Sequence, residues 1–162
     1  MSHLSFVLLG ALLGCLVASG AAGVVPSPRI LVVKDIKEFV AQNPSVHLQA
    51  LEKEIVLPKA RDAGLLSVRY NLGARISGDR LVAQSADTYG YSQYQDVSLQ
   101  LTYPESGSGA IVSYVEITCT QDDSDGSAYV IAGGIGQRFI SIVLEANNTK
   151  NFSYQVQYYG QN

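Results

Sequence analysis

The side chains that most often carry catalytic or metal chemistry are scarce in this 162-residue chain. Its two histidines, His3 and His47, both precede the β-rich part, so no Ser-His-Asp or Cys-His arrangement can form within that part. The commonest zinc ligand is missing there too. No pair of carboxylates is singled out, although a hydrolase built on two converging acids stays an alternative. We therefore expect a protein that is not an enzyme, with no catalytic residue, cofactor or metal.

Two short patterns resemble ligand sites. The acidic run Asp122-Asp123-Ser124-Asp125-Gly126 resembles the start of a calcium loop, but the later oxygen ligands of such a loop do not follow at the required offset. A hairpin turn with positive φ at Gly126 explains this run better. The run Gly133-Gly134-Ile135-Gly136 lacks the Lys-Ser/Thr pair of a phosphate loop, so we expect a tight bend or bulge there.

One thiol is expected in the mature protein. Cys15 lies in the N-terminal apolar run, which leaves Cys119 without an intrachain partner. Cys119 could form an intermolecular bridge or be a buried, inert thiol. It alternates in phase with Val115 and Ile117, which favours burial of this free thiol.

Residues 1–22 are predicted to be a secretory signal peptide. The apolar run from Leu4 to Val17 is shorter than a membrane span, and small residues that suit cleavage after Gly20 or Ala22 follow it. A buried helix or a membrane anchor is the alternative. Because no second apolar stretch is long enough to cross a bilayer, we expect no membrane span after signal removal.

Residues 23–63 are predicted to form a linker and a helical hairpin. Asp35 and Glu38 resemble a capping box at the start of one helix, and Ser45 can cap a second helix that ends at Pro58. The hairpin would span residues 35–56. It is either a propeptide released near Lys59-Ala60-Arg61 or a stable part of the fold packed on the sheet.

Residues 64–162 are predicted to form a mainly β domain. Apolar and polar residues alternate over Val97–Tyr103, Ile140–Leu144 and Phe152–Tyr158, as in strands with one buried face. Such segments recur at intervals of roughly ten residues with turn signals between them. This pattern predicts an antiparallel β-sandwich or barrel of about seven to eight short strands, preceded by the short helical segment. The tyrosine-rich stretch Asp87–Tyr94 is expected to be a loop or irregular strand.

The polar stretch Asn147–Asn151 is predicted to be a turn between two strands. It contains two N-glycosylation acceptors, Asn147-Asn148-Thr149 and Asn151-Phe152-Ser153. Both would lie in one hairpin turn of a protein with a signal peptide. We therefore expect a glycan on Asn147, on Asn151 or on both.

The charge of the β domain argues against direct nucleic-acid binding. From Val68 onward the chain carries five basic and nine acidic side chains, a difference of −4. An acidic domain without a Lys/Arg stripe is repelled by phosphate backbones. Nucleic acid is therefore not expected as a direct partner.

Several short motifs together resemble a known family. They are Gly73-Ala74-Arg75, Gly78-Asp79-Arg80-Leu81, Tyr114-Val115-Glu116-Ile117-Thr118, Asp125-Gly126, Gly133-Gly134-Ile135-Gly136-Gln137 and Val156-Gln157-Tyr158-Tyr159-Gly160. Over roughly Tyr70 to Gly160 the chain resembles the insect family named after multiprotein bridging factor two, which includes chains described as salivary secreted peptides. The resemblance marks ten turn or structural positions: Gly78, Asp79, Asp125, Gly126, Gly133, Gly134, Gly136, Gln137, Tyr159 and Gly160.

The resemblance implies two incompatible roles. The namesake of the family is a transcriptional coactivator that bridges other factors without binding DNA itself, whereas other members resemble secreted proteins. The predicted signal peptide and glycosylation acceptors favour secretion. We therefore expect an extracellular, non-enzymatic binding module of insect body fluid or saliva, with an unknown extracellular protein or small ligand as its partner. The alternative is a coactivator that connects a DNA-binding factor to the general transcription machinery.

Overall fold

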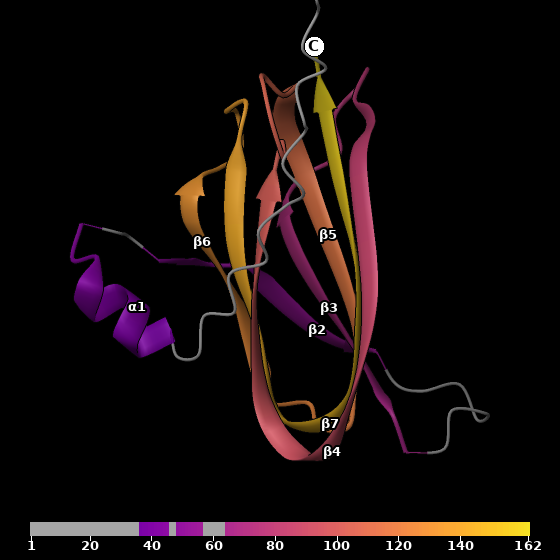
Figure 1. Ribbon diagram of the computed structural model, residues 1–162. Coiled ribbons are helices and arrows are strands. Elements are labelled where there is room, and N and C mark those ends of the chain that lie inside the picture. The colour runs from indigo at the N-terminus through magenta and orange to yellow at the C-terminus, as the bar shows by residue number, and fades with distance from the viewer. Residues whose placement is uncertain (1–35, 46–47, 57–63) are drawn as a thin grey trace, which may run out of the picture.

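The computed structural model describes residues 36–45, 48–56 and 64–162. One antiparallel sheet contains all seven described strands, in the order β1-β6-β7-β5-β3-β2, with β4 paired to β7. Figure 1 shows this sheet curled into a nearly closed barrel with one short helix beside it. The predicted fold class is confirmed. The elements are α1 (Ile36–Gln42), β1 (Gln49–Ala50), β2 (Glu52–Val56), β3 (Leu66–Gly73), β4 (Arg80–Tyr103), β5 (Ile111–Gln121), β6 (Gly126–Gly133) and β7 (Ile140–Gln161).

Two parts of the predicted domain organisation lie outside the described residues. They are the signal peptide over residues 1–22 and the processing site at Lys59-Ala60-Arg61. Within the described part of the chain, no helix has the length and apolar character needed to cross a bilayer.

The barrel is built around β4 and β7, which are much longer than the short strands predicted. They pair from Arg80 opposite Gly160 to Tyr103 opposite Ile140, with an interruption after Gly90. The first half of β7 also pairs with β6, and its second half pairs with β5. Figure 1 shows β4 and β7 bending together at one end of the barrel. Each of these strands therefore belongs to two opposite walls.

The turn predicted at Asn147–Asn151 is wrong, because β7 continues through these residues. The ladder between β4 and β7 is irregular beside them, with register shifts between Gly90 and Val97. Asn148 adopts a positive φ of 48°. The polar, turn-forming residues therefore mark a bend within one strand. The stretch Asp87–Tyr94 likewise lies inside β4 and bends with it.

Two carboxylates complete the hydrogen bonding of the backbone at this bend. Asp96 Oδ1 accepts a hydrogen bond of 2.9 Å from the Asn148 amide. Asp122 Oδ2 accepts hydrogen bonds of 2.7 Å from the amides of Lys150 and Asn151. Backbone amides that lose a ladder partner need another acceptor, and here these carboxylates supply it. The β5–β6 loop is thereby attached to the bend.

Asp122 makes the stability of the bend depend on pH. The hydrogen bond from the Asn151 amide is the largest cause that holds the pKa of Asp122 below its ordinary value. The pKa of Asp122 is lower in the folded protein than in the unfolded chain. The hydrogen bonds to its carboxylate therefore stabilise the fold at pH values above the ordinary pKa of about 4, and this stabilisation is lost as pH falls through the lowered pKa. We expect Asp122→Asn to destabilise the protein at pH 7 and to reduce the fall in stability as pH drops below about 4. Urea unfolding at several pH values checks this, and an unchanged profile would contradict it.

The second predicted helix is replaced by β1 and β2. β2 pairs with β3, from Glu52 opposite Asn71 to Val56 opposite Ser67, while β1 pairs with β6. Leu51 lies between β1 and β2, is buried, and donates its amide hydrogen to Ala128 O at 2.9 Å. Leu48 and Ile55, which would share the apolar face of the predicted helix, are exposed. Sheet pairing outweighs the helical spacing here, so the sheet begins upstream of residue 64.

Alternating side chains of the walls fill the barrel. In β5, Val115, Ile117 and Cys119 are each 0% exposed, whereas Ile111, which lies before the register shift between Val112 and Tyr114, is exposed. In the second half of β7, the residues from Phe152 to Tyr158 that face inward are buried. Cys119 is a free thiol, and its burial raises its pKa to about 12. The thiol is therefore protonated at neutral pH.

Candidate functional site

The two halves of β4 border a seam in the barrel wall. One half, up to Gln95, pairs with the second half of β7, and the other half, from Val97, pairs with the first half of β7. Across the described residues, β4 forms a ladder with β7 and with no other strand. Each half of β4 therefore ends one wall of the barrel and leaves one backbone edge without a strand partner.

A pocket of about 300 Å³ lies in this seam. Ala83, Gln84 and Ser85 line it from one half of β4, and Gln100 to Tyr103 line it from the other half. β7 contributes Tyr154, Val156 and Tyr158. The pocket thus has an apolar, aromatic floor and a polar rim, as protein sites for apolar groups commonly have.

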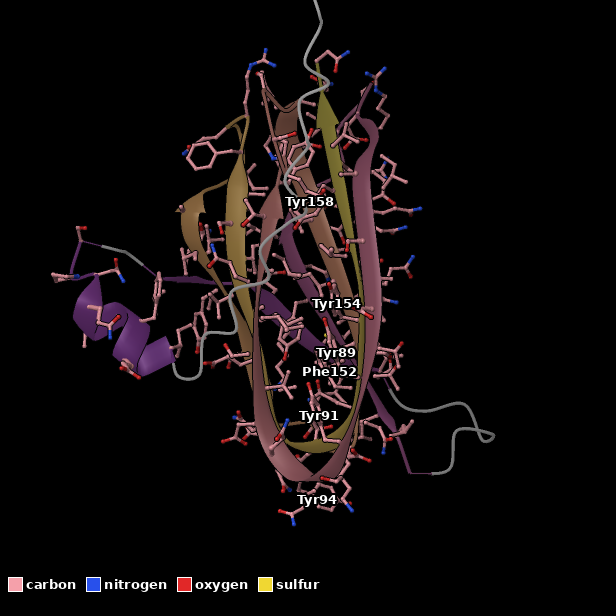
Figure 2. The ribbon with its side chains drawn as sticks, in the orientation of Figure 1. Tyr89, Tyr91, Tyr94, Phe152, Tyr154 and Tyr158 are labelled. Atoms are coloured by element: carbon pink, nitrogen blue, oxygen red, sulfur yellow. The ribbon has the colours of Figure 1, made fainter. Side chains whose placement is uncertain are left out.

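A column of aromatic side chains follows the seam, and we call Tyr158, Tyr154, Phe152, Tyr89 and Tyr91 the aromatic column (Figure 2). The ring centroids of Tyr89 and Phe152 are 6.3 Å apart, and those of Tyr89 and Tyr91 are 6.4 Å apart. At the other end of the column, Tyr158 stacks on Tyr103 at 5.2 Å. Stacked and tilted rings hold one another in place and give the floor of the seam a fixed shape.

The tyrosines of the stretch Asp87–Tyr94 have different environments. Tyr89 and Tyr91 are partly buried and pack against the core, whereas Tyr94 is 58% exposed at the bend. The Lys150 ammonium lies 5.1 Å from the centroid of the Tyr94 ring. Of the three side chains, Tyr94 is the one that presents an open surface.

The seam carries little charge at neutral pH. Burial raises the pKa of Tyr158 well above its ordinary value, and nearby Tyr154 and Glu105 add to this. Burial and a hydrogen bond to Asp87 raise the pKa of Tyr89 in the same way. Among the described residues lining the pocket, Glu105 is the one that belongs to the Asp, Glu, Lys, Arg and His group. The described residues also contain no group of three or more His, Cys, Asp or Glu placed to hold a metal.

Asp79 and its neighbours fasten the β3–β4 loop to β5. The Asp79 carboxylate accepts hydrogen bonds from Arg75 Nη2 at 2.8 Å, from the Ile76 amide at 2.9 Å and from Ser113 Oγ at 2.9 Å. The hydrogen bond from Arg75 is the largest cause that lowers the pKa of Asp79. The guanidinium of Arg75 also lies 3.8 Å from the centroid of the Tyr159 ring. Asp79 and Tyr159 therefore share Arg75 and hold one end of the barrel.

The β6–β7 loop is held against the start of β5. The Gly136 amide donates to Val112 O and the Val112 amide donates to Gln137 O, both at 2.8 Å. Gly78, Gly133, Gly134 and Gly136 all have positive φ, between 69° and 146°. A Cβ on Gly160 would collide with the carbonyl oxygen of Ile111. These loops lie at the end of the barrel that carries the C-terminus (Figure 1).

Asp125 and Gly126 lie beside the bend of β7. Asp125 O accepts hydrogen bonds from Gln121 Nε2 at 3.0 Å and from the Asn147 amide at 3.1 Å. A Cβ on Gly126, where φ is 154°, would meet the carbonyl oxygen of Glu145. None of the ten motif residues is among the described residues that line the pocket. Their contacts shape the two ends of the barrel.

Both predicted glycosylation acceptors lie on the bend. Asn147 Nδ2 donates a hydrogen bond of 3.1 Å to Asp125 Oδ2, and Asn151 Nδ2 donates one of 3.2 Å to Asp122 Oδ1. The side-chain amides that would carry a glycan therefore take part in hydrogen bonds that hold the bend.

Sequence reasoning missed the pocket itself. Alternation placed Tyr154 and Tyr158 on the inner face, but no pattern joined them to Ser85, Thr102 or Glu105. The missing information was the bend in β4, which brings residues 83–85 and 100–106 to opposite sides of one pocket. The absence of proline from Leu81 to Tyr103 was the available signal for one long strand.

Comparison with known proteins gave one finding. The family model described as "Transcription activator MBF2" matches residues 72–160, from the end of β3 to the end of β7. No curated protein and no solved structure matches the chain. The match confirms the family resemblance expected from the motifs and gives no support to the salivary secreted type.

The family match corrects two expectations. The extracellular binding module and the secreted localisation are contradicted, because the matched family is described as a transcription activator and transcription takes place in the nucleus. The signal-like N-terminus and the two glycosylation acceptor motifs favour the secreted role, whereas the family match favours the coactivator role. Glycosylation of Asn147 or Asn151 stays a prediction, and it depends on the secretory route that the match contradicts.

Proposed function

Because the chain belongs to the MBF2 family of transcription activators, we propose that it is a nuclear, non-enzymatic coactivator that acts by binding other proteins. The family match carries this proposal, since it covers β4 to β7 and therefore most of the barrel. The partners are a DNA-binding factor and a component of the general transcription machinery, which the chain connects.

The charge supports a role without direct DNA contact. The chain has a net charge of −3, and its acidic side chains outnumber the basic ones in the β domain. Proteins that bind DNA directly neutralise phosphates with clustered Lys and Arg. A coactivator held at a gene by another protein needs no such cluster.

The geometry of the seam supports binding rather than catalysis. Its pocket combines aromatic rings with uncharged polar side chains such as Gln84 and Gln100. The raised pKa values of Tyr89 and Tyr158 leave these phenols neutral, so neither supplies a base at neutral pH. An apolar pocket beside unpaired strand edges is suited to holding part of another protein.

A tethering experiment tests the proposal. The full chain is fused to a heterologous DNA-binding domain and assayed on a reporter gene that carries the matching site. We expect severalfold more transcription than with the DNA-binding domain alone, whereas the unfused chain should neither activate the reporter nor shift its DNA in gel electrophoresis. An inactive fusion that enters the nucleus, or activation through direct DNA binding by the unfused chain, would count against the proposal.

A further inference from the structure

We propose that the seam binds one extended segment of a partner protein as an added β-strand, with an apolar side chain of that segment in the pocket. The inference rests on the proposed function and names the surface through which it would act. Three features of the seam support it: unprotected strand edges, a pocket sized for a side chain and the charge at the rim.

Over residues 83–90 and 97–103, where β4 pairs with β7 without a register shift, its edges lack the usual protection against strand addition. Proteins commonly block long edge strands with lysine, proline or a covering element. From Leu81 to Tyr103, β4 contains neither lysine nor proline, and its charged residues there are Asp87 and Asp96. Gln84, Ser85 and Thr102, which line the seam, are exposed, uncharged side chains that leave the backbone accessible. An extended peptide can hydrogen-bond to such an edge.

The pocket is suited to a side chain of the added strand. Its volume of about 300 Å³ is at the small end of ligand sites, and its walls include Leu101, Val156 and Tyr154. Successive side chains of a strand point to opposite sides. One row of the added strand would therefore face the pocket and the other row would face solvent. The partner segment should alternate apolar and polar residues.

Glu105 gives the seam a preference for positive charge. It is exposed and lines the pocket at the end of the β4 half that contains Leu101. The chain as a whole is acidic, with a net charge of −3. A Lys or Arg beside the apolar anchor would be attracted to Glu105, and an acidic residue there would be repelled. The expected partner segment is therefore extended, free of proline at its centre and basic at one end.

Selection of displayed peptides tests this inference on the full chain. Randomised eight-residue peptides are selected for binding, and the best one is synthesised with a fluorescent label as the probe. We expect alternating peptides with Lys or Arg near an apolar anchor. We expect the double variant Ser85→Lys with Thr102→Lys to bind the probe at least about tenfold more weakly. Both side chains are exposed, and buried Ser141, which loses the Thr102 hydroxyl as a partner, keeps its hydrogen bond from Gln100 Nε2. The variant should therefore fold, and its melting temperature checks this.

Matched variants separate the seam from a general charge effect. The control for the double variant also adds two positive charges: Gln155→Lys with Ser77→Lys places both at exposed positions that do not line the seam pocket, and it should bind the probe as the unmodified chain does. Glu105→Gln should weaken binding by a few-fold and reduce its dependence on salt.

Three outcomes would overturn the inference. They are the absence of any enriched peptide, a selected peptide that keeps its affinity for the double variant, and binding that requires deletion of residues 1–35. The last outcome would make the N-terminal segment of this chain the occupant of the seam.

The reporter assay tests the coactivator function independently of peptide binding. A double variant that loses the peptide but activates normally would remove the seam from the coactivator function. If the chain binds the selected peptide but its fusion to the DNA-binding domain does not activate the reporter, the result counts against the coactivator function and leaves the peptide site in place.

Discussion

Replacing Ile142 by aspartate is expected to destabilise the protein more than any other change predicted for it. Ile142 is 0% exposed and lies opposite Leu101 of β4 and Val130 of β6, both of which are buried. The carboxylate would enter the core without a partner and would remove apolar contacts with two strands. We expect a loss of about 4 kcal/mol or more, which is a large part of the roughly 5–15 kcal/mol that stabilises an ordinary domain.

The matched control is Ile142→Val, which keeps the apolar character and removes one methylene group. Its expected cost is about 1 kcal/mol. Circular dichroism at increasing temperature measures both variants. If the aspartate variant melts with the unmodified chain, then the assignment of this part of β7 to the core is wrong.

Replacing Gly133 by alanine is also expected to destabilise the protein strongly. Gly133 has a φ of 69°, and a Cβ there would collide with the carbonyl oxygen of Phe139. The same carbonyl accepts a hydrogen bond of 3.1 Å from the Gly134 amide, so it cannot move without opening the β6–β7 loop. Strained backbone combined with this collision should cost about 3 kcal/mol. Urea unfolding measures the loss.

Gly90→Ala is the matched control for Gly133→Ala. Gly90 lies within β4 and does not have a positive φ, and a Cβ added to it would have no neighbouring atom within 4 Å. Alanine there should be neutral or stabilising by up to about 1 kcal/mol, because it reduces the freedom of the unfolded chain. Equal losses in the two variants would show that glycine content, and not the geometry at Gly133, explains the effect.

Together, the family match and the fold explain why the motif residues differ from the binding residues. Asp79 and Gly136 tie loops to β5, and Gly126 allows β6 to approach β7. These residues keep the barrel in shape. The polar rim of the seam is formed by side chains that the family motifs do not include, such as Ser85 and Thr102, whereas Val156 and Tyr158 of its floor belong to the last motif. Under the proposed function, the motifs would keep the scaffold and the seam would select the partner.

The sequence by itself determined the class of the fold and much of its core. Alternation over Phe152–Tyr158 and Val115–Cys119 placed the buried side chains on the correct face, because the side-chain period of a strand does not depend on its partners. The glycine-rich run at residues 133–136 predicted a bend there, because positive φ is a local property of glycine.

The tertiary structure alone decided where strands begin, end and bend. The pattern at Leu48, Leu51 and Ile55 suits a helix, but pairing with β3 and β6 makes it strands. The polar run from Asn147 to Asn151 suits a turn. The carboxylates of Asp96 and Asp122, which lie far away in the sequence, accept hydrogen bonds from its backbone amides, so that β7 continues through it. Hydrogen-bond partners supplied by distant segments leave no trace in a local pattern. The seam depends on the same bend, so its pocket was visible only after the chain had folded.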